Sequence, residues 1–475
     1  MTKEHKILTN KLAAKYILQK CFYTFLKEVY LTLNPGQEFL ENWHIKYLCT
    51  LLEEVENGKH KNIIINIPPR SLKSTIITVA WTAWMLGKYP NKKIITASYS
   101  LKLSTKLSQD CRNVMTSTWY RNAFNCFKIA NDQNCKHKFS TTKHGVRIAT
   151  SVGASIIGEG ADILICDDPL SPLQAYSKTY RDRVYDWFME SFSTRLNDKK
   201  NGIKIIVMQR LHEDDLCGRI LNLFSNKWLQ VIIPAIADKD KIYQTYRYKT
   251  FIKENAYLHE DREDKEVLTE ICSNLGSQAF SAQYLQKPIP LSGNIVKREW
   301  INRYEKIDYN QGIIVQSWDL AFTNKSYSDY SACTTWLIKD HNFYLLDVFK
   351  AKLEFSSLKK KILNLYHSWD CHYLILEDTV ATKALIDDIS TNKELNVIRY
   401  QPLSDKITRL ALCGPIFESG KIHFPESAEW LMDFERELFS FPNCDHDDQV
   451  DSVSQFINYS KKFTQQNLNK YILTF

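Results

Sequence analysis

Short apolar runs of strand length recur along the first 290 residues and alternate with segments of helical periodicity. Parallel strands need crossover connections, which are usually helices, so this alternation is typical of a mostly parallel sheet covered by helices. It therefore predicts an α/β fold. The runs are KNIIINIPP, KKIITASYS, DILIC, GIKIIVM and LQVIIP.

A segment containing Pro288, Pro290 and Gly293 divides the chain and predicts a linker over 286–310. Before it we expect a helical region over 1–58, ended by Gly58, and a first α/β domain over 59–285. After it we expect a second α/β domain over 311–475. Its pattern predicts a strand (IIVQSWDLA), two hairpin-like strands (CTTWLI, FYLLDVF), a Lys-rich helix, a further strand (HYLILED) and then helices to the end.

Composition excludes several classes of protein. No apolar run approaches the roughly 20 residues of a transmembrane helix, and the charged N-terminus lacks the apolar core of a signal peptide. Twelve cysteines without a C-x-x-C pair indicate reduced thiols in a cytosol. The net charge of +8 is compatible with a polyanionic partner but does not establish one.

The segment NIIINIPPRSLKST places Lys73 and Ser74 between a predicted strand and a predicted helix. In that setting backbone N–H groups bind phosphate, the lysine reaches the terminal phosphates and the serine holds Mg²⁺. Arg70 could stabilise charge on the transferred phosphoryl group. Ile67 and Leu72 stand where the usual phosphate loop has glycines, so by itself the match could be chance.

The segment ADILICDDP is an apolar strand that ends in Asp167 and Asp168. We expect Asp167 to organise the magnesium shell and Asp168 to activate the attacking water; a strand that simply ends in a polar turn is the alternative. Just upstream, three of the fourteen glycines lie within SVGASIIGEG. This density predicts unusual backbone dihedrals or a close approach, in either a structural turn or a DNA-facing loop.

A third element follows the predicted strand GIKIIVM. VMQRLHEDDLCGR carries Arg210, His212 and Glu213, which could sense the γ-phosphate. A solvated helix N-terminus with acids in its first turn is the alternative.

The second domain carries three separated groups of carboxylates. Asp319 lies in a strand, Glu377 ends another, and Asp447, Asp448 and Asp451 open a late helix. Acidic side chains in buried strands are costly unless they are paired or bind metal. If these three groups of carboxylates meet in the folded domain, they would hold two divalent cations about 4 Å apart for attack on a phosphate. The sequence does not choose among the three helix acids.

Taken together, these motifs resemble the large terminase subunit of tailed bacteriophages over about residues 35–460. The resemblance implies a RecA-like, additional-strand P-loop ATPase domain followed by a ribonuclease H-like nuclease domain. The motifs are PPRSLKS, ILICDDP, MQRLHEDDL, SWDLAF with SDYS, ILEDTVAT and HDDQVDS.

The resemblance also implies residue roles. Ser71, Lys73, Ser74 and Thr75, with Arg70 and Arg210, would bind ATP, and Ser74 and Asp167 would hold Mg²⁺. NWHIKYL is similar to the family's adenine-binding region, which makes Trp43 and His44 candidate base contacts. The family often has Glu where Asp168 stands. Asp319, Glu377 and one of the three helix acids would hold Mg²⁺ or Mn²⁺ for nuclease chemistry.

Such proteins cut concatemeric viral DNA and pump it through a portal into a procapsid. We therefore expect double-stranded DNA, a small terminase subunit and a portal protein as partners, no membrane, a homo-oligomeric ring on the portal, and a place in the bacterial cytoplasm. A helicase-like repair nuclease and an inactive prophage remnant are the alternatives. Lysines in Lys352–Lys361 could contact DNA phosphate, or could form a solvated helical face.

Overall fold

The structure is a computed structural model that describes residues 3–125, 128–289, 295–309, 312–321, 330–402, 404–444 and 446–472. The chain divides into two compact units, Met1–Cys272 with Ser277–Pro290, and Ser273–Gly276 with Leu291–Phe475. Within the described residues, no helix is long and apolar enough to cross a membrane.

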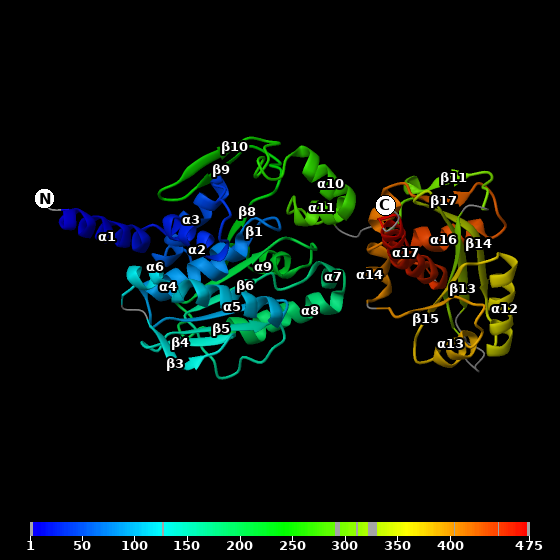
Figure 1. The fold of residues 1–475 in the computed structure, drawn as a ribbon, viewed down its shortest axis with the longest axis horizontal. Coiled ribbons are helices and arrows are strands. Elements are labelled where there is room, and N and C mark those ends of the chain that lie inside the picture. Colours follow the sequence, from blue (N-terminus) through cyan, green and yellow to red (C-terminus); the bar gives the residue numbers. More distant parts are fainter. Residues whose placement is uncertain are drawn as a thin grey trace. The chain divides into compact units, whose positions relative to one another are not determined.

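Unit 1 is built on an eight-stranded sheet in the order β3-β4-β5-β2-β6-β7-β1-β8 (Figure 1). The six strands β5, β2, β6, β7, β1 and β8 pair in parallel. At one edge of the sheet, β4 pairs antiparallel with β5, and β3 pairs antiparallel with β4. The five apolar runs noted in the sequence become β1, β2, β6, β7 and β8. The strands are β1 (Asn62–Asn66), β2 (Lys93–Ser98), β3 (Ile129–Asn134), β4 (Lys138–Thr141), β5 (Val146–Ser151), β6 (Ile163–Asp167), β7 (Ile203–Met208) and β8 (Leu229–Ile232).

Both faces of this sheet are buried, which explains why its strands read as continuous apolar runs. Ile63 and Ile65 of β1 pack into a cluster with α2, α3 and α5, whereas Ile64 packs on the opposite face with α8 and α9. The helical elements are α1 (Lys3–Lys20), α2 (Phe22–Leu33), α3 (Trp43–Glu56), the π-helix η1 (Thr75–Trp81), α4 (Thr82–Lys88), α5 (Leu101–Thr116), α6 (Thr118–Ala123), α7 (Pro172–Ala175), α8 (Lys178–Asp186), η2 (Trp187–Phe192), η3 (Ser193–Arg195), α9 (Leu216–Phe224), η4 (Ser225–Lys227), α10 (Lys265–Leu275) and α11 (Ser277–Gln283).

The strand order decides which loops meet. β7 lies between β1, which leads into the Lys73 loop, and β6, which ends at Asp167. Because these strands are parallel, their carboxyl ends share one edge of the sheet. This inserted strand is the additional strand expected of the ATPase fold. A separate hairpin of β9 (Lys241–Gln244) and β10 (Lys249–Ile252) completes the unit's strands among the described residues.

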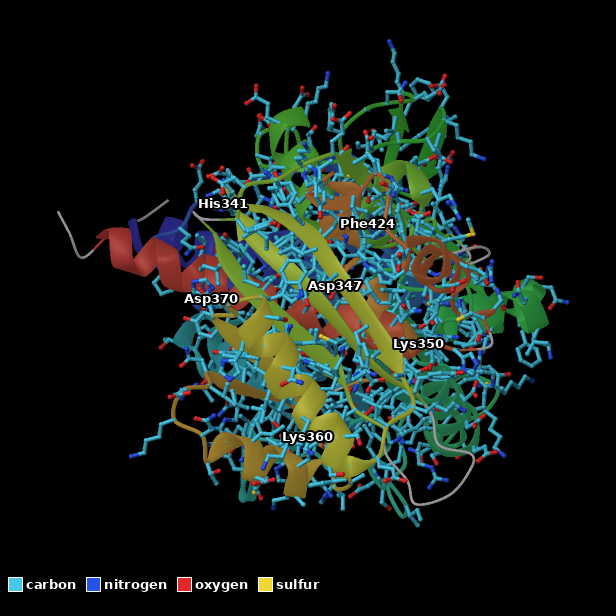
Figure 2. The ribbon with its side chains drawn as sticks, turned by 90° about the vertical axis from the view of Figure 1, so that its right-hand side faces the viewer. His341, Asp347, Lys350, Lys360, Asp370 and Phe424 are labelled. Atoms are coloured by element: carbon cyan, nitrogen blue, oxygen red, sulfur yellow. The ribbon has the colours of Figure 1, made fainter. Side chains whose placement is uncertain are left out.

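Unit 2 contains a seven-stranded mixed sheet in the order β11-β17-β14-β13-β12-β15-β16. β12, β13 and β14 pair antiparallel, and β15 continues the sheet in parallel beside β12. Helix α12, which carries Lys360, lies over one face of this sheet (Figure 2). The strands are β11 (Asn302–Tyr304), β12 (Ile313–Asp319), β13 (Ser331–Lys339), β14 (Asn342–Ala351), β15 (Tyr373–Glu377), β16 (Val397–Tyr400) and β17 (Ile422–Pro425).

The expectation of helices alone after HYLILED was wrong, because β16 and β17 lie in that region. Each has only four residues and lies at or near a sheet edge, too short for an alternating pattern to be recognised. Three residues of the predicted linker form β11, which pairs with β17; residues 290–294 and 310 of that linker lie outside the described part. The helical elements are η5 (Arg298–Trp300), α12 (Phe355–Ser368), α13 (Lys383–Ser390), α14 (Lys406–Ala411), α15 (Gly414–Glu418), α16 (Leu431–Ser440) and α17 (Asp448–Ile472).

Helix α17 is attached to the middle of the second sheet by both polar and apolar contacts. The Ser452 hydroxyl donates to the carbonyl oxygen of Ser317 in β12, and the Ser317 hydroxyl donates to the carbonyl of Ser452. Phe456 stacks on Trp336 of β13 with ring centroids 4.7 Å apart, and both side chains are fully buried. These contacts attach the N-terminal half of α17 to β12 and β13.

We predict that Phe456→Ala lowers the free energy of unfolding of unit 2 by about 3–5 kcal/mol, because it removes a stacked ring from a closed core. Denaturant unfolding of the full chain, followed by tryptophan fluorescence, measures the change. Met432→Ala, at a side chain that is 73% exposed, serves as the control and should shift the transition little. Equal shifts in the two variants would contradict the anchoring role of Phe456.

Candidate functional sites

The loop after β1 and the end of β6 meet at the shared edge of the first sheet. The Ser74 hydroxyl donates to Asp167 Oδ1 at 3.0 Å, and the Thr78 hydroxyl donates to Asp167 Oδ2 at 2.6 Å. The Lys73 ammonium lies 3.2 Å from Asp168 Oδ2. The lysine, the serine and both acids that the sequence singled out are thus brought together.

The backbone around these groups adopts left-handed conformations at non-glycine residues. Arg70 has φ 61°, Leu72 has φ 62° and Asp168 has φ 43°. Leu72 therefore takes the left-handed conformation that favours glycine, while its side chain packs against the core of unit 1. Such strain concentrates at functional sites and persists only where the surroundings over-determine the backbone.

Asp167 is fully buried, and its charge is compensated only in part. Burial raises the pKa of Asp167, and repulsion by the neighbouring Asp168 raises it further. The hydroxyl groups of Thr78 and Ser74 and the Lys73 ammonium act in the opposite direction. A buried carboxylate beside a serine hydroxyl is a donor set that suits Mg²⁺, which prefers oxygen ligands.

Gln209, at the end of β7, is a site residue that the sequence reasoning missed. Lys73 donates to Gln209 Oε1 at 3.2 Å, so this amide and Asp168 both bind the ammonium. A signal was present in the sequence, because Gln209 directly follows a buried strand and precedes Arg210, a candidate for sensing the γ-phosphate.

The side chain of Arg210 is committed within its own loop. Its Nε donates to both Asp215 oxygens at 3.1 and 2.9 Å, and Nη2 donates to the carbonyls of His212 and Glu213. Asp215 also caps α9 by accepting from the Gly218 N–H. The Arg210 guanidinium therefore stabilises the loop after β7.

The two candidate base contacts lie at the start of α3. The ring of Trp43 packs against Tyr243 with centroids 4.7 Å apart. The buried His44 ring lies 3.3 Å from the carbonyl oxygen of Ser71, so it touches the phosphate loop itself. Burial lowers the pKa of His44 to about 3, which keeps this ring neutral near neutral pH.

Of the other predicted loop residues, Ser71 is buried and its hydroxyl donates to the Pro68 carbonyl at 2.6 Å, whereas Arg70 is exposed. Thr75 is half-buried at the first position of η1. In the glycine-rich segment, Gly158 has φ 84°, and a Cβ on Gly160 would lie 2.1 Å from Asn197 Oδ1. Both expected causes of the glycine density, left-handed dihedrals and close approach, are present.

The second candidate site lies where β12, β15 and α17 meet. Asp319 is the last residue of β12, Glu377 is the last residue of β15, and these strands pair in parallel. Burial raises the pKa of Asp319 well above its usual range, and the next causes are repulsion from Asp451 and from Glu377. No hydrogen bond or ion pair from a described residue reaches the Asp319 carboxylate.

The three helix acids face different neighbours. Asp451 is buried, and its charge is the largest electrostatic contribution to the raised pKa of Asp319. Asp448 lies 3.7 Å from Lys350 of β14, which Figure 2 labels. Asp447 precedes the helix and accepts the backbone N–H of Asp451 through its carbonyl oxygen. Of the three helix acids, Asp451 repels the Asp319 carboxylate most strongly, which favours Asp451 as the third acid of this site.

Two cations from α14 reach into this group of acids. Arg409 lies 3.1 Å from Glu377 and 2.6 Å from Asp451, and Lys406 lies 2.7 Å from Asp451. The sequence reasoning missed both residues, because nothing in the chain predicts that α14 packs against α17.

As the side chains stand, no group of three or more His, Cys, Asp or Glu residues in the described part of the chain is arranged so that it could hold a metal ion. The oxygen donors of Asp319, Glu377 and Asp451 are nevertheless those that Mg²⁺ and Mn²⁺ accept, and the three carboxylates share one region.

Two further polar residues lie near the predicted acids in the sequence, Asp329 after Asp319 and His446 before Asp447. The His446 ring contacts Tyr330 with centroids 5.1 Å apart, and Asp329 falls outside the described residues. Within Lys352–Lys361, Lys359 pairs with Asp388 at 2.6 Å and Lys361 lies over the Phe349 ring. Lys360 is exposed on α12.

Comparison with known proteins agrees with this architecture. Residues 316–460 match the family model of the terminase RNaseH-like domain. No curated protein matches the sequence significantly.

Among solved structures, the large terminase of a thermophilic bacteriophage, in complex with ADP, aligns with TM-score 0.54 and 10% identity, over 88% of this chain and 99% of that one. The same phage protein in complex with ATP-gamma-S aligns with TM-score 0.52 and 10% identity, over 87% and 98%. The predicted resemblance and fold class are confirmed. Residues 316–460 therefore match the model of the terminase ribonuclease H-like domain, and the chain as a whole has a fold similar to that of a phage large terminase.

Proposed function

We propose that this chain is the large terminase subunit of a tailed phage or prophage, which hydrolyses ATP to move double-stranded DNA and cuts that DNA with divalent metal. The observation that carries the proposal is the pairing of two phosphate-chemistry sites in one chain. One is the Lys73 loop beside Asp167 and Asp168, and the other is the group Asp319, Glu377 and Asp451.

In the first site, the Lys73 ammonium would leave Asp168 and Gln209 and would bind the terminal phosphates of the nucleotide. Ser74 and Asp167 would hold Mg²⁺, the ion that would neutralise phosphate charge when bound. Asp168 would then be free to orient the attacking water, and Gln209 would be placed to respond to the γ-phosphate. Arg70, exposed in the loop, remains our candidate for stabilising charge on the transferred phosphoryl group.

In the second site, Asp319, Glu377 and Asp451 would hold Mg²⁺ or Mn²⁺, which would activate a water and stabilise the leaving oxygen of a DNA phosphate. Asp448 and Asp447 would contribute less, because Asp448 faces Lys350 and the side chain of Asp447 is much more exposed than that of Asp451. Exposed lysines such as Lys360 are candidates for sequence-independent contact with the DNA backbone.

By the family resemblance, the partners would be a small terminase subunit and the portal of a procapsid, in the host cytoplasm, with several copies of this chain assembled as a ring on the portal. The helicase-like repair nuclease and the inactive remnant stay as the alternatives. The first would unwind duplex DNA without a portal, and the second would turn over no ATP.

Lys73→Ala should reduce ATP hydrolysis by at least about 100-fold, because the variant lacks the cation that would bind the terminal phosphates. Steady-state phosphate release measures the effect. The matched control is Lys102→Ala, at an exposed lysine in the first turn of α5, and it should hydrolyse ATP like the unmodified chain. Undiminished hydrolysis in Lys73→Ala would remove the ATPase assignment.

Asp451→Asn should reduce Mn²⁺-dependent cleavage of plasmid DNA by at least about 100-fold, because a carboxylate next to Asp319 is lost. Asp448→Asn, three residues earlier on the same helix, should retain cleavage within about threefold, since that side chain faces Lys350. Nicking and linearisation rates on gels distinguish the two variants. If Asp448→Asn is the inactive one, the choice of acid is wrong; if neither variant loses activity, the nuclease assignment is wrong.

A further inference from the structure

Helix α14 supplies two cations to the proposed nuclease acids, and their surroundings differ sharply. Arg409 is only 5% exposed. Its Nη1 donates to Glu377 Oε2 at 3.1 Å and its Nη2 donates to Asp451 Oδ1 at 2.6 Å. The backbone of Arg409 is also held, because Asn458 of α17 donates to its carbonyl oxygen at 3.0 Å. Arg409 is therefore a fixed bridge between two carboxylates.

Lys406, one turn earlier on α14, reaches one of these two acids, Asp451, from the solvent side. Its side chain is 43% exposed, whereas that of Asp451 is 3% exposed. The ammonium lies 2.7 Å from Asp451 Oδ2 and 2.6 Å from Asp447 Oδ1. The two oxygens of Asp451 are thus divided, with Oδ1 bound by Arg409 and Oδ2 bound by Lys406.

A divalent cation held by Asp319 and Asp451 needs an oxygen of Asp451. Releasing Oδ1 would leave the Arg409 guanidinium buried with one partner fewer, which is costly. Releasing Oδ2 only requires a flexible, half-exposed lysine side chain to turn into water, where an ammonium is well hydrated. Asp451 Oδ2, which Lys406 binds, is therefore the oxygen that a metal ion can bind.

We propose that Lys406 is an internal counter-ion of the nuclease acids, which neutralises Asp451 when no divalent cation is bound and leaves Asp451 Oδ2 when one binds. This inference rests on the proposed nuclease function. Lys406 is then a positioning residue that competes with the metal, so its charge sets how tightly this chain binds the metal. Asp447, also paired with Lys406, would keep the displaced ammonium near the site.

The competition can be measured without any cleavage assay. Calorimetric titration of the full, nucleotide-free chain with Mn²⁺ reports metal affinity, and the same titration of Asp319→Asn identifies the part that belongs to the nuclease acids. Lys406→Met retains most of the apolar stem but removes the charge, so this variant should bind Mn²⁺ roughly tenfold more tightly. Lys406→Gln, a second neutral variant, should behave in the same way.

Two controls separate competition from a general change in charge or packing. Lys406→Arg keeps the cation and should bind Mn²⁺ much as the unmodified chain does. Lys359→Ala removes a lysine whose ion pair with Asp388 lies on α12 and α13, and it should leave the affinity unchanged.

Three results would overturn the inference. Equal affinities in Lys406→Met, Lys406→Gln and Lys359→Ala would mean that Lys406 does not compete. Weaker binding in both neutral variants would mean that the lysine assists the metal. If the unmodified chain and Asp319→Asn bind Mn²⁺ identically, the proposed nuclease site fails together with the inference, whereas the first two results leave that site standing.

Discussion

Carboxylates at the ends of buried strands are the constraint on which both sites depend. Asp167 ends β6 and Asp319 ends β12, and burial disfavours the charged form of each. A buried charge must be paired, hydrogen-bonded or bound to a cation. The two units compensate the charge of their buried carboxylates with different groups.

In unit 1 the compensation is local to the phosphate loop. Two hydroxyls bind Asp167, and Lys73 is placed against Asp168 and Gln209. These groups lie at the carboxyl ends of adjacent parallel strands, so the sheet itself brings them together. Leu72 of this loop has a left-handed backbone conformation, and its side chain packs against the core of unit 1.

In unit 2 the compensation comes from a separate helix. Arg409 and Lys406 bind Glu377 and Asp451, while Asp319 is left facing other acids. The serine and aromatic contacts that attach α17 to β12 and β13 position Asp451 for this arrangement. In a nuclease with this geometry, Arg409 and Lys406 would compensate the charge of the acids until a divalent cation binds.

Local patterns of hydrophobicity and charge in the sequence predicted the five apolar strands of unit 1, the Lys73–Ser74 loop, the acids of the buried strands and a late helix opened by Asp447, Asp448 and Asp451. Tertiary structure decided the rest. The short strands β16 and β17, the role of Gln209 beside Lys73, the bracing of Arg210 by Asp215 and the choice of Asp451 over Asp448 depend on which elements pack together. The cations of α14 depend on it most, because Lys406 and Asp451 are 45 positions apart in the sequence and only chain packing brings their charges within 2.7 Å.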